Sequence, residues 1–377
     1  MPNEALERHL FSDGPKRILA LDGGGIRGVL TLSYLRRIED ILRRRTGNKD
    51  LVLSDHFDLI GGTSTGAIIA ASLAKGYSIA ALQELYQSLA DEVFQRKFWR
   101  KGAFLAKFNH KSLVKALDAH FGGYTLGDDR LVTGLVVIAK RWDTGSTWVM
   151  HNNPKGVYYD RSSPGSDPNR LYDLAQVIRA STAAPTYFQP EEIRIARGKT
   201  GKFIDGGVSP HNNPALVTLM VATLDRFRLN WPMTADKLTL ISVGTGMEDP
   251  NPVAPRVWQV WKKAAAYDGV SSLLALRADC DWLNQTMLQW LSSSPTAWRI
   301  DREMGDLSND LIDGQELLRY YRYNVEFSPE WLDENLEEKV SKKEADSLAE
   351  MDNPKNVKRL AEIGDIAAEK QISESHL

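Results

Sequence analysis

Several features that would point to a particular cellular compartment are scarce or absent in this sequence. Its 377 residues include one cysteine, Cys280, so the chain cannot form an internal disulfide, which suits a reducing compartment. No apolar run approaches the roughly 20 residues that a membrane-spanning helix needs. Residues 1–16 are charged and lack the apolar core of a signal peptide. Together these absences predict a cytoplasmic protein.

The chain also lacks an excess of charge of either sign. It has 47 Lys and Arg against 49 Asp and Glu, a formal net charge of −2. A nearly neutral chain gives no electrostatic reason to expect nucleic acid as a partner, or strong attraction to acidic membranes. Clusters with metal-ligand spacing and calcium-binding loops are missing from the sequence, so we expect no metal and no cofactor. The composition, 42% hydrophobic and 25% charged, is ordinary for a globular chain with a sizeable core.

The most informative feature that is present is a Gly-Thr-Ser-Thr-Gly block at residues 62–66. It follows the short apolar run 57–60 and precedes the apolar run 67–74, which predicts a strand, a sharp turn and a helix. Gly62 and Gly66 allow a turn that a Cβ would block, and the turn would lift Ser64 to the end of the sheet. This nucleophile elbow suits a catalytic serine; the simpler alternative is a glycine-rich connecting loop.

A second glycine-rich block lies upstream, between a predicted buried strand at 17–21 and a predicted helix at 29–45. Gly23, Gly24 and Gly25 expose backbone N–H groups without side-chain cover, and such donors at a helix N-terminus suit an oxyanion or a phosphate. In acyl transfer they would form an oxyanion hole. Arg27 adds a positive charge near the mouth of this loop.

The same block also permits a dinucleotide-binding alternative, because Gly23, Gly25 and Gly28 match G-x-G-x-x-G. That site needs an acid about 20 residues further on, at the end of the second strand. Asp50 precedes the next apolar run, 51–53, and Asp55 follows it too late. We therefore treat dinucleotide binding as the weaker interpretation of this loop.

A third block, Asp205-Gly206-Gly207, ends a short apolar strand at 203–204. An acid at this place could accept a proton from Ser64, directly or through water. The alternative is an Asp-Gly turn with a structural role. A Ser-His-Asp triad of the α/β-hydrolase type would need a histidine after the acid. His211 lies in a polar loop and His376 lies at the chain end, where fraying is usual, so the sequence disfavours a triad.

In order and spacing, the three blocks resemble the patatin-like phospholipase family, over about residues 17–246. The segment 181–188 also resembles a family segment that packs beside the site. The resemblance implies lipid acyl hydrolysis by a Ser-Asp dyad without a catalytic histidine. The implied site residues are the nucleophile Ser64, the base Asp205, the oxyanion-hole amides of Gly23, Gly24 and Gly25, and the supporting residues Arg27, Gly62, Gly66, Gly206 and Gly207.

An aspartate is a poor base for a serine at its reference pKa of about 3.9. Burial disfavours the charged carboxylate and raises its pKa. We therefore predict that Asp205 is mostly buried and lies close to Ser64.

The remaining pattern predicts a three-layer α/β/α fold with a mostly parallel central sheet flanked by helices. We expect an N-terminal extension at 1–16, a catalytic domain at 17–330 and a charged helical tail at 331–377. Further strands are predicted at 131–132 with 135–139, 147–150, 238–243 and 320–325. Further helices are predicted at 79–94, 172–181, 214–227 and 356–370. Ligands of such sheets bind at the carboxyl ends of the strands, where all three blocks are expected.

A cap-like helical region is expected at about 250–300, which holds five of the ten tryptophans. Most of them would fill an ordinary core, and one or two would contact lipid. Trp258 and Trp261, followed by Lys262 and Lys263, are the first choice for a peripheral membrane contact, because aromatic residues beside lysines suit a headgroup boundary.

The resemblance leaves three functional hypotheses. The first is an enzyme that cleaves acyl esters of membrane lipids such as phospholipids. The second is a membrane-degrading phospholipase effector of bacterial defence signalling, silent until a cyclic nucleotide binds. The third, a catalytically inactive scaffold, is disfavoured because Ser64 and Asp205 are intact. The sequence pattern selects no head group and no oligomeric state.

Overall fold

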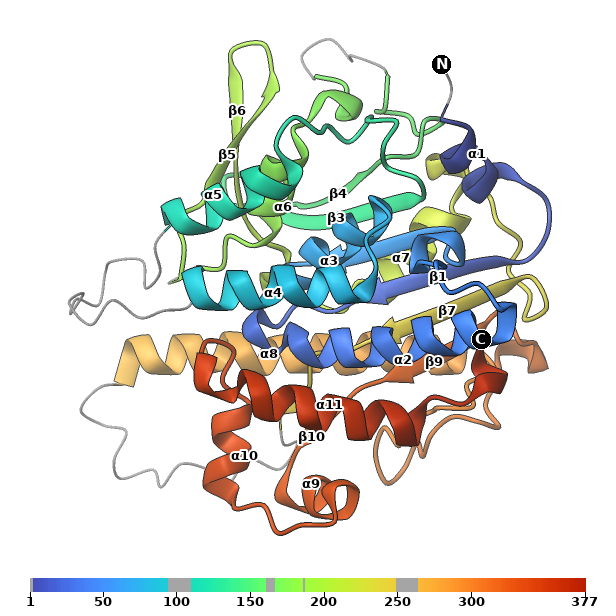
Figure 1. The fold of residues 1–377 in the computed structure, drawn as a ribbon, viewed down its shortest axis with the longest axis vertical. Coiled ribbons are helices and arrows are strands. Elements are labelled where there is room, and N and C mark those ends of the chain that lie inside the picture. The colour runs from blue at the N-terminus through green and yellow to red at the C-terminus, as the bar shows by residue number, and fades with distance from the viewer. Residues whose placement is uncertain (1–2, 94–109, 161–166, 186, 249–263) are drawn as a thin grey trace.

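The computed structural model describes residues 3–93, 110–160, 167–185, 187–248 and 264–377, and helices enclose a central mixed sheet (Figure 1). The strand order within these residues is β5-β6-β3-β2-β1-β7-β9, with β4 paired to β3. The strands are β1 (Lys16–Leu21), β2 (Leu59–Thr63), β3 (Gly134–Arg141), β4 (Thr147–His151), β5 (Glu191–Ala196), β6 (Lys199–Asp205), β7 (Leu238–Val243) and β9 (Arg319–Tyr323). A separate parallel pair is formed by β8 (Met247–Glu248) and β10 (Glu326–Phe327).

The centre of the sheet is parallel and its β5 end is antiparallel. Strands β3, β2, β1, β7 and β9 pair in parallel with one another, whereas β4 and β6 run antiparallel to β3, and β5 runs antiparallel to β6. The central strands are buried along most of their length, which explains their nearly continuous apolar sequences.

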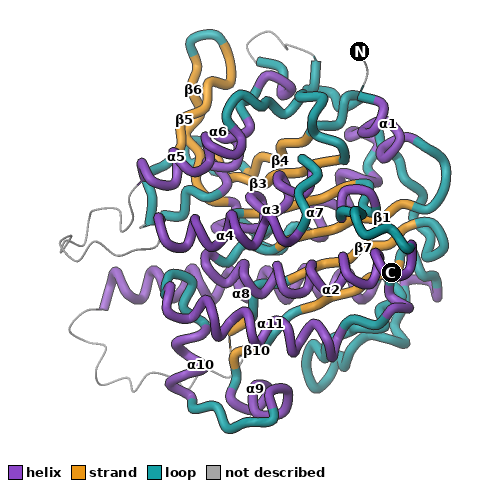
Figure 2. Tube along the Cα trace, viewed as in Figure 1, coloured by secondary structure: helices purple, strands orange, loops and turns teal. Residues whose placement is uncertain are grey.

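Two hydrophobic cores lie on opposite faces of the sheet, as the alternation along β1 shows. Leu19 and Leu21 join one core, and Ile18 and Ala20 join the other. The first core is completed by α2 (Gly28–Thr46), α3 (Thr65–Ala74), α4 (Ile79–Val93), α5 (His110–Phe121), α6 (Leu174–Ser181), α9 (Pro329–Leu336), α10 (Lys342–Leu348) and α11 (Val357–Gln371). The second core is completed by α1 (Glu4–Phe11), α7 (Ala215–Thr223) and α8 (Ala264–Trp290). This arrangement confirms the predicted three-layer α/β/α fold (Figure 2).

The C-terminal helix α11 packs along α2, although the two helices are far apart in the sequence (Figure 1). Gly364 allows the close approach, because a Cβ there would lie 2.9 Å from the Cβ of Ser33. Ion pairs join Arg36 to Asp365 at 2.6 Å and Arg37 to Glu369 at 3.1 Å. The predicted boundary between a catalytic domain and a tail at residue 330 stays a prediction.

Several predicted elements differ from the structure in extent. β3 begins at Gly134, and residues 131–132 lie before it, where the Leu131 N–H closes a turn onto the Asp128 carbonyl. The sequence did not predict β5, in which only Ile193 and Ala196 are buried and which forms a hairpin with β6. Trp258, Trp261, Lys262 and Lys263 lie outside the described residues. Among the described helices, none is both long and apolar enough to cross a membrane.

Candidate active site

Ser64 occupies the sharp turn between β2 and α3. Its backbone angles, φ 55° and ψ −123°, lie in a region that residues with a side chain rarely adopt. The turn depends on its two glycines, because a Cβ on Gly62 would lie 2.2 Å from the Gly66 carbonyl oxygen, and one on Gly66 would lie 2.1 Å from that of Leu21. Ser64 itself is only partly buried. The strained turn thus presents the Ser64 side chain at the edge of the sheet.

Asp205 lies beside Ser64 and is almost fully buried, with 4% of its surface exposed. The Ser64 hydroxyl donates a hydrogen bond to Asp205 Oδ2 at 2.6 Å, and the Gly207 N–H donates to Oδ1 at 2.6 Å. Burial raises the pKa of the Asp205 carboxyl to about 6, although both hydrogen bonds favour the carboxylate. The carboxyl group is therefore a stronger base than an exposed aspartate.

The direction of β6 explains how Asp205 reaches Ser64. Because β6 is antiparallel to β3, it enters from beyond the carboxyl edge of the parallel strands and ends where Asp205 pairs with Ala139. Gly206 follows in a place without room for a side chain, since a Cβ there would lie 2.4 Å from the Ile138 carbonyl oxygen. The predicted acid thus meets the predicted nucleophile through a strand that runs against the others.

The segment at 181–188 contacts both residues of the pair. The Ser181 hydroxyl accepts a hydrogen bond from the Ser64 N–H at 2.9 Å and donates to the Ile138 carbonyl at 2.6 Å. The Asp205 N–H donates to the Ala183 carbonyl at 3.1 Å. The end of α6 therefore fixes the backbone of both residues.

The upstream glycine loop abuts Ser64, since a Cβ on Gly23 would lie 3.1 Å from Ser64 Cβ. The Gly23 N–H donates to the Asn212 carbonyl at 3.1 Å. Within the described residues, the N–H groups of Gly24 and Gly25 have no hydrogen-bond acceptor. These two amides are thus the available donors among the three that the sequence singled out.

Residues near the C-terminus hold this loop in place, and the sequence gave no local signal of them. The Ile26 N–H donates to the Met351 carbonyl at 3.0 Å, and the Arg27 guanidinium donates to the Ala349 carbonyl at 2.9 Å. Arg27 was expected near the mouth of the loop, and the structure buries it, with 1% of its surface exposed, over the ring of Phe327. Burial lowers the pKa of Arg27 to about 10, so it stays charged at neutral pH.

Asp22, which directly precedes the glycines, forms a buried ion pair with Arg322 of β9. The two guanidinium nitrogens of Arg322 donate to Asp22 Oδ2 at 2.6 Å and to Oδ1 at 3.1 Å. Arg322 Nη1, the nitrogen that donates to Oδ1, also donates to the Ser242 hydroxyl at 2.8 Å. The start of the loop is therefore tied to the neighbouring strands β7 and β9.

Helix α8 approaches the site from the other side. Asp281 accepts hydrogen bonds from the Asn212 side chain and from the Asn213 N–H, each at 3.1 Å, and so holds the loop that follows Asp205. Arg277, one turn earlier on α8, lies 3.9 Å from Asp281, and its charge lowers the pKa of Asp205.

Neither of the two late histidines joins the Ser64–Asp205 pair. His211 takes part nearby through its backbone, because its carbonyl accepts from the Thr63 hydroxyl at 2.7 Å and its N–H donates to the Ser209 hydroxyl at 3.2 Å. Burial lowers the pKa of its imidazole. His376 stacks on Tyr321 and lies 2.9 Å from the Tyr323 hydroxyl, so this chain end is packed rather than frayed. Within the described residues, the Ser64 hydroxyl has Asp205 as its hydrogen-bond partner.

The comparisons with known proteins identify the class to which this fold and site belong. The family model described as Patatin-like phospholipase matches residues 19–219, more than half of the chain. The chain belongs to the patatin-like phospholipase family, which confirms the resemblance drawn from the three blocks.

Individual relatives come from bacteria and plants. The chain is 31% identical over 243 residues to a cGAMP-activated phospholipase of Escherichia coli (strain TW11681), covering 63% of this chain and 64% of that protein. It is 31% identical over 253 residues to a cUMP-AMP-activated phospholipase of Escherichia coli, covering 67% and 71%. It is 29% identical over 245 residues to Patatin-16 of Solanum tuberosum, covering 61% and 60%. The match thus spans less than two thirds of the first and third of these relatives.

Proposed function

We propose that this protein is a serine hydrolase that cleaves acyl esters of membrane lipids through a Ser64–Asp205 dyad. The observation that carries the proposal is the 2.6 Å hydrogen bond from the Ser64 hydroxyl to the buried Asp205 carboxylate. The strained turn at Ser64 and the two unoccupied amides of Gly24 and Gly25 support the same chemistry.

The reaction follows from these positions. Asp205 takes the proton of Ser64 while the serine oxygen attacks the ester carbonyl, and the Gly24 and Gly25 amides stabilise the oxyanion of the tetrahedral intermediate. When the intermediate collapses, the ester C–O bond breaks and the leaving alcohol takes the proton from Asp205. Water then attacks the acyl-enzyme and gives its proton to Asp205, and the fatty acid is released as Ser64 regains a proton.

An exposed apolar stripe on α8 supports peripheral contact with a membrane. Leu276, Leu283 and Trp290 follow one another at intervals of seven residues and have 59%, 60% and 41% of their surface exposed. Seven residues make two helical turns, so the three side chains share one face. The opposite face of α8 carries Asp281, which holds the loop after Asp205. A membrane bound to this stripe would lie close to the catalytic residues.

The dyad is tested by fatty-acid release from phospholipid vesicles. We expect Ser64→Ala and Asp205→Asn each to lower kcat by at least about 1000-fold, with the Asp310→Asn variant of an exposed loop as a control. Circular dichroism of each variant checks folding. Full activity of folded Ser64→Ala would exclude Ser64 as the nucleophile.

A second candidate function is hydrolysis that depends on a cyclic nucleotide. The names of two bacterial relatives favour it, since one is a cGAMP-activated and the other a cUMP-AMP-activated phospholipase. We expect the rate of vesicle hydrolysis to rise at least tenfold when cGAMP or cUMP-AMP is added. Equal rates with and without both nucleotides would leave a constitutive hydrolase.

A further inference from the structure

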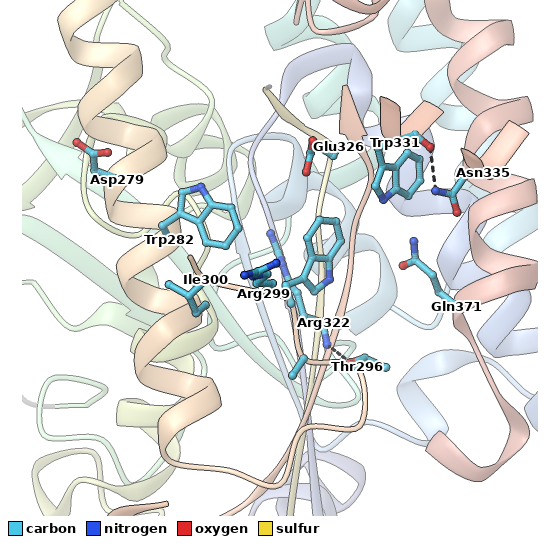
Figure 3. Close-up of a pocket in the computed structure, with 12 residues that line it drawn as sticks. Asp279, Trp282, Thr296, Arg299, Ile300, Arg322, Glu326, Trp331, Asn335 and Gln371 are labelled. Carbon is cyan, nitrogen blue, oxygen red and sulfur yellow. Dashed lines mark hydrogen bonds between the residues drawn. The ribbon is translucent and has the colours of Figure 1, made fainter. Parts of the chain in front are cut away.

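A cavity of about 770 Å³ lies apart from the Ser64–Asp205 pair, between α8 and the C-terminal elements. We propose that this cavity binds the base and phosphate of a nucleotide, and that Arg322 links the bound nucleotide to the glycine loop. This inference rests on the proposed nucleotide-dependent hydrolysis and gives it a site. Figure 3 shows Trp282 and Trp331 on opposite sides of the cavity, with Arg299 and Arg322 between them.

Three tryptophans from separate elements give the cavity its flat aromatic walls. Trp282 belongs to α8, Trp331 to α9, and Trp298 to the loop that follows α8. Gln289 fixes that loop, because its amide donates to the Trp298 carbonyl at 2.8 Å and accepts from the Trp298 N–H at 3.0 Å. All three side chains are only partly buried, so their rings are accessible for stacking. Stacked indoles suit a planar heterocycle such as a purine, and tolerate different bases.

The polar groups of the cavity favour a nucleotide over an acyl chain. Arg299 lines the cavity and is exposed, and its Nε donates to the Asp301 carbonyl at 3.1 Å. Among the described residues, no ion pair includes its guanidinium. Glu326 and Asn335 also line the cavity and offer acceptors and donors to the edge of a base. An acyl chain would desolvate these polar groups without replacing their hydrogen bonds.

Arg322 connects the cavity to the catalytic loop. It lines the cavity, only 2% of its surface is exposed, and its Nε is buried with no hydrogen-bond partner. The other two nitrogens of the same guanidinium hold both oxygens of Asp22, the residue before the catalytic glycines. The backbone N–H of Arg322 donates to the hydroxyl of Thr296 at 2.8 Å, and Thr296 lines the cavity as well. A ligand that contacts this wall would therefore reach the glycine loop through Arg322 and its ion pair with Asp22.

Binding is tested apart from catalysis, by isothermal titration calorimetry on the full Ser64→Ala chain. The probes are cGAMP, cUMP-AMP, AMP, adenosine and oleate. We expect at least one nucleotide to bind, and Trp282→Ala or Trp331→Ala to weaken it at least tenfold. Trp142→Ala, an exposed tryptophan outside the cavity, is the matched control and should not change the affinity. Binding of oleate alone, or equal nucleotide affinity in all three tryptophan variants, would overturn the proposal.

A second variant keeps the test independent of folding. Arg299 is exposed, so Arg299→Gln should leave the fold intact, weaken AMP several-fold and leave adenosine, which has no phosphate, unchanged. Equal loss for AMP and adenosine would show that Arg299 does not hold the phosphate.

Activity assays on the wild-type chain separate the two proposals. Nucleotide binding without lipid hydrolysis would refute the hydrolase and leave the cavity site standing. Hydrolysis without nucleotide binding would refute the cavity site alone. If a nucleotide binds in the cavity but leaves the hydrolysis rate unchanged, the proposed link through Arg322 is wrong.

Discussion

At the scale of single residues, the chemistry depends on how one carboxyl group is placed. Asp205 gains basicity from burial and loses some of it to the hydrogen bonds of Ser64 and Gly207, with a resulting pKa of about 6. The pKa of Asp205 therefore lies close to neutral pH, where a general base works best, and no imidazole is needed. This raised pKa of Asp205 leads to one prediction on activity and one on stability.

The first prediction concerns activity against pH. Because Asp205 must be ionised to accept a proton, kcat/KM for a soluble ester should fall about tenfold per pH unit below pH about 6. Arg277 lowers the pKa of Asp205, so Arg277→Gln should move this acid limb to higher pH. Arg36→Gln, on the surface of α2, should leave it in place. An unchanged limb in Arg277→Gln would show that the titrating group is another residue.

The second prediction concerns stability. The pKa of Asp205 is raised in the folded protein from about 3.9 in the unfolded chain, so its contribution favours the fold at low pH and is lost as the pH rises through about 6. Removing the charge by Asp205→Asn should therefore stabilise the protein at pH 8, by on the order of 1–3 kcal/mol. The melting temperature should rise by about 1–4 °C.

At pH 4 the variant should no longer be more stable than the wild type, because the Asp205 carboxyl of the wild type is then largely protonated and uncharged. Calorimetry of both proteins at the two pH values provides the measurement. A variant that melts below the wild type at pH 8 would contradict the sign of the effect.

At the scale of elements, the glycine loop is held by the segment between α10 and α11. The carbonyls of Ala349 and Met351 receive hydrogen bonds from Arg27 and Ile26, and Gly25, at φ 60°, packs against the Met351 carbonyl. These contacts fix the part of the loop that carries the N–H groups of Gly24 and Gly25. We therefore propose that Arg27 is a positioning residue that acts through the loop.

The third prediction tests this role of Arg27. Arg27→Met should lower kcat by about 10–100-fold with little change in KM, because misplaced oxyanion donors affect the transition state more than substrate binding. Arg27→Lys should restore part of the rate, since a lysine keeps the charge. Steady-state kinetics on a soluble ester give the measurement, with thermal melting as a check on folding. A proportional rise in KM at constant kcat would instead assign Arg27 to substrate binding.

The same element shows how far the sequence predicts this site. Ser64, Asp205 and the glycines are visible because each stands at the end of an apolar run, in a short pattern that depends on local geometry. Arg322, Ala349 and Met351 are not, because they reach the loop across about 300 residues and two of them act through the main chain. β5 was not predicted for another reason: only two of its six residues, Ile193 and Ala196, are buried, so it lacks the apolar pattern of a strand. Local patterns thus pointed to the residues that we propose as reacting groups, while the contacts that hold them arise from the tertiary fold.

At the scale of the whole molecule, α8 separates three environments. One face holds the loop after Asp205 through Asp281, a second presents Trp282 to the cavity, and a third exposes the stripe of Leu276, Leu283 and Trp290. The loop after Asp205, the cavity and the proposed membrane contact therefore all lie along α8.

The fourth prediction concerns the stripe. The double variant Leu276→Gln/Leu283→Gln should bind phospholipid vesicles at least about tenfold more weakly, because each buried leucine side chain contributes about 1.5–3 kcal/mol. Hydrolysis of a soluble ester should stay within about twofold of the wild type. Leu171→Gln, an exposed leucine elsewhere on the surface, is the control for vesicle co-sedimentation. Unchanged vesicle binding in the double variant would place the membrane contact on another surface.

The two hydrogen bonds that the segment 349–351 accepts have a consequence for how this protein can diverge. Both end on main-chain carbonyls, which every amino acid supplies, so these two bonds depend on the path of the chain and not on which side chains stand at 349 and 351. Substitutions that keep this path should therefore leave both bonds in place, whereas a one-residue deletion would remove them and inactivate the enzyme. The support of the glycine loop would then be conserved as a backbone conformation, which a sequence alignment does not record.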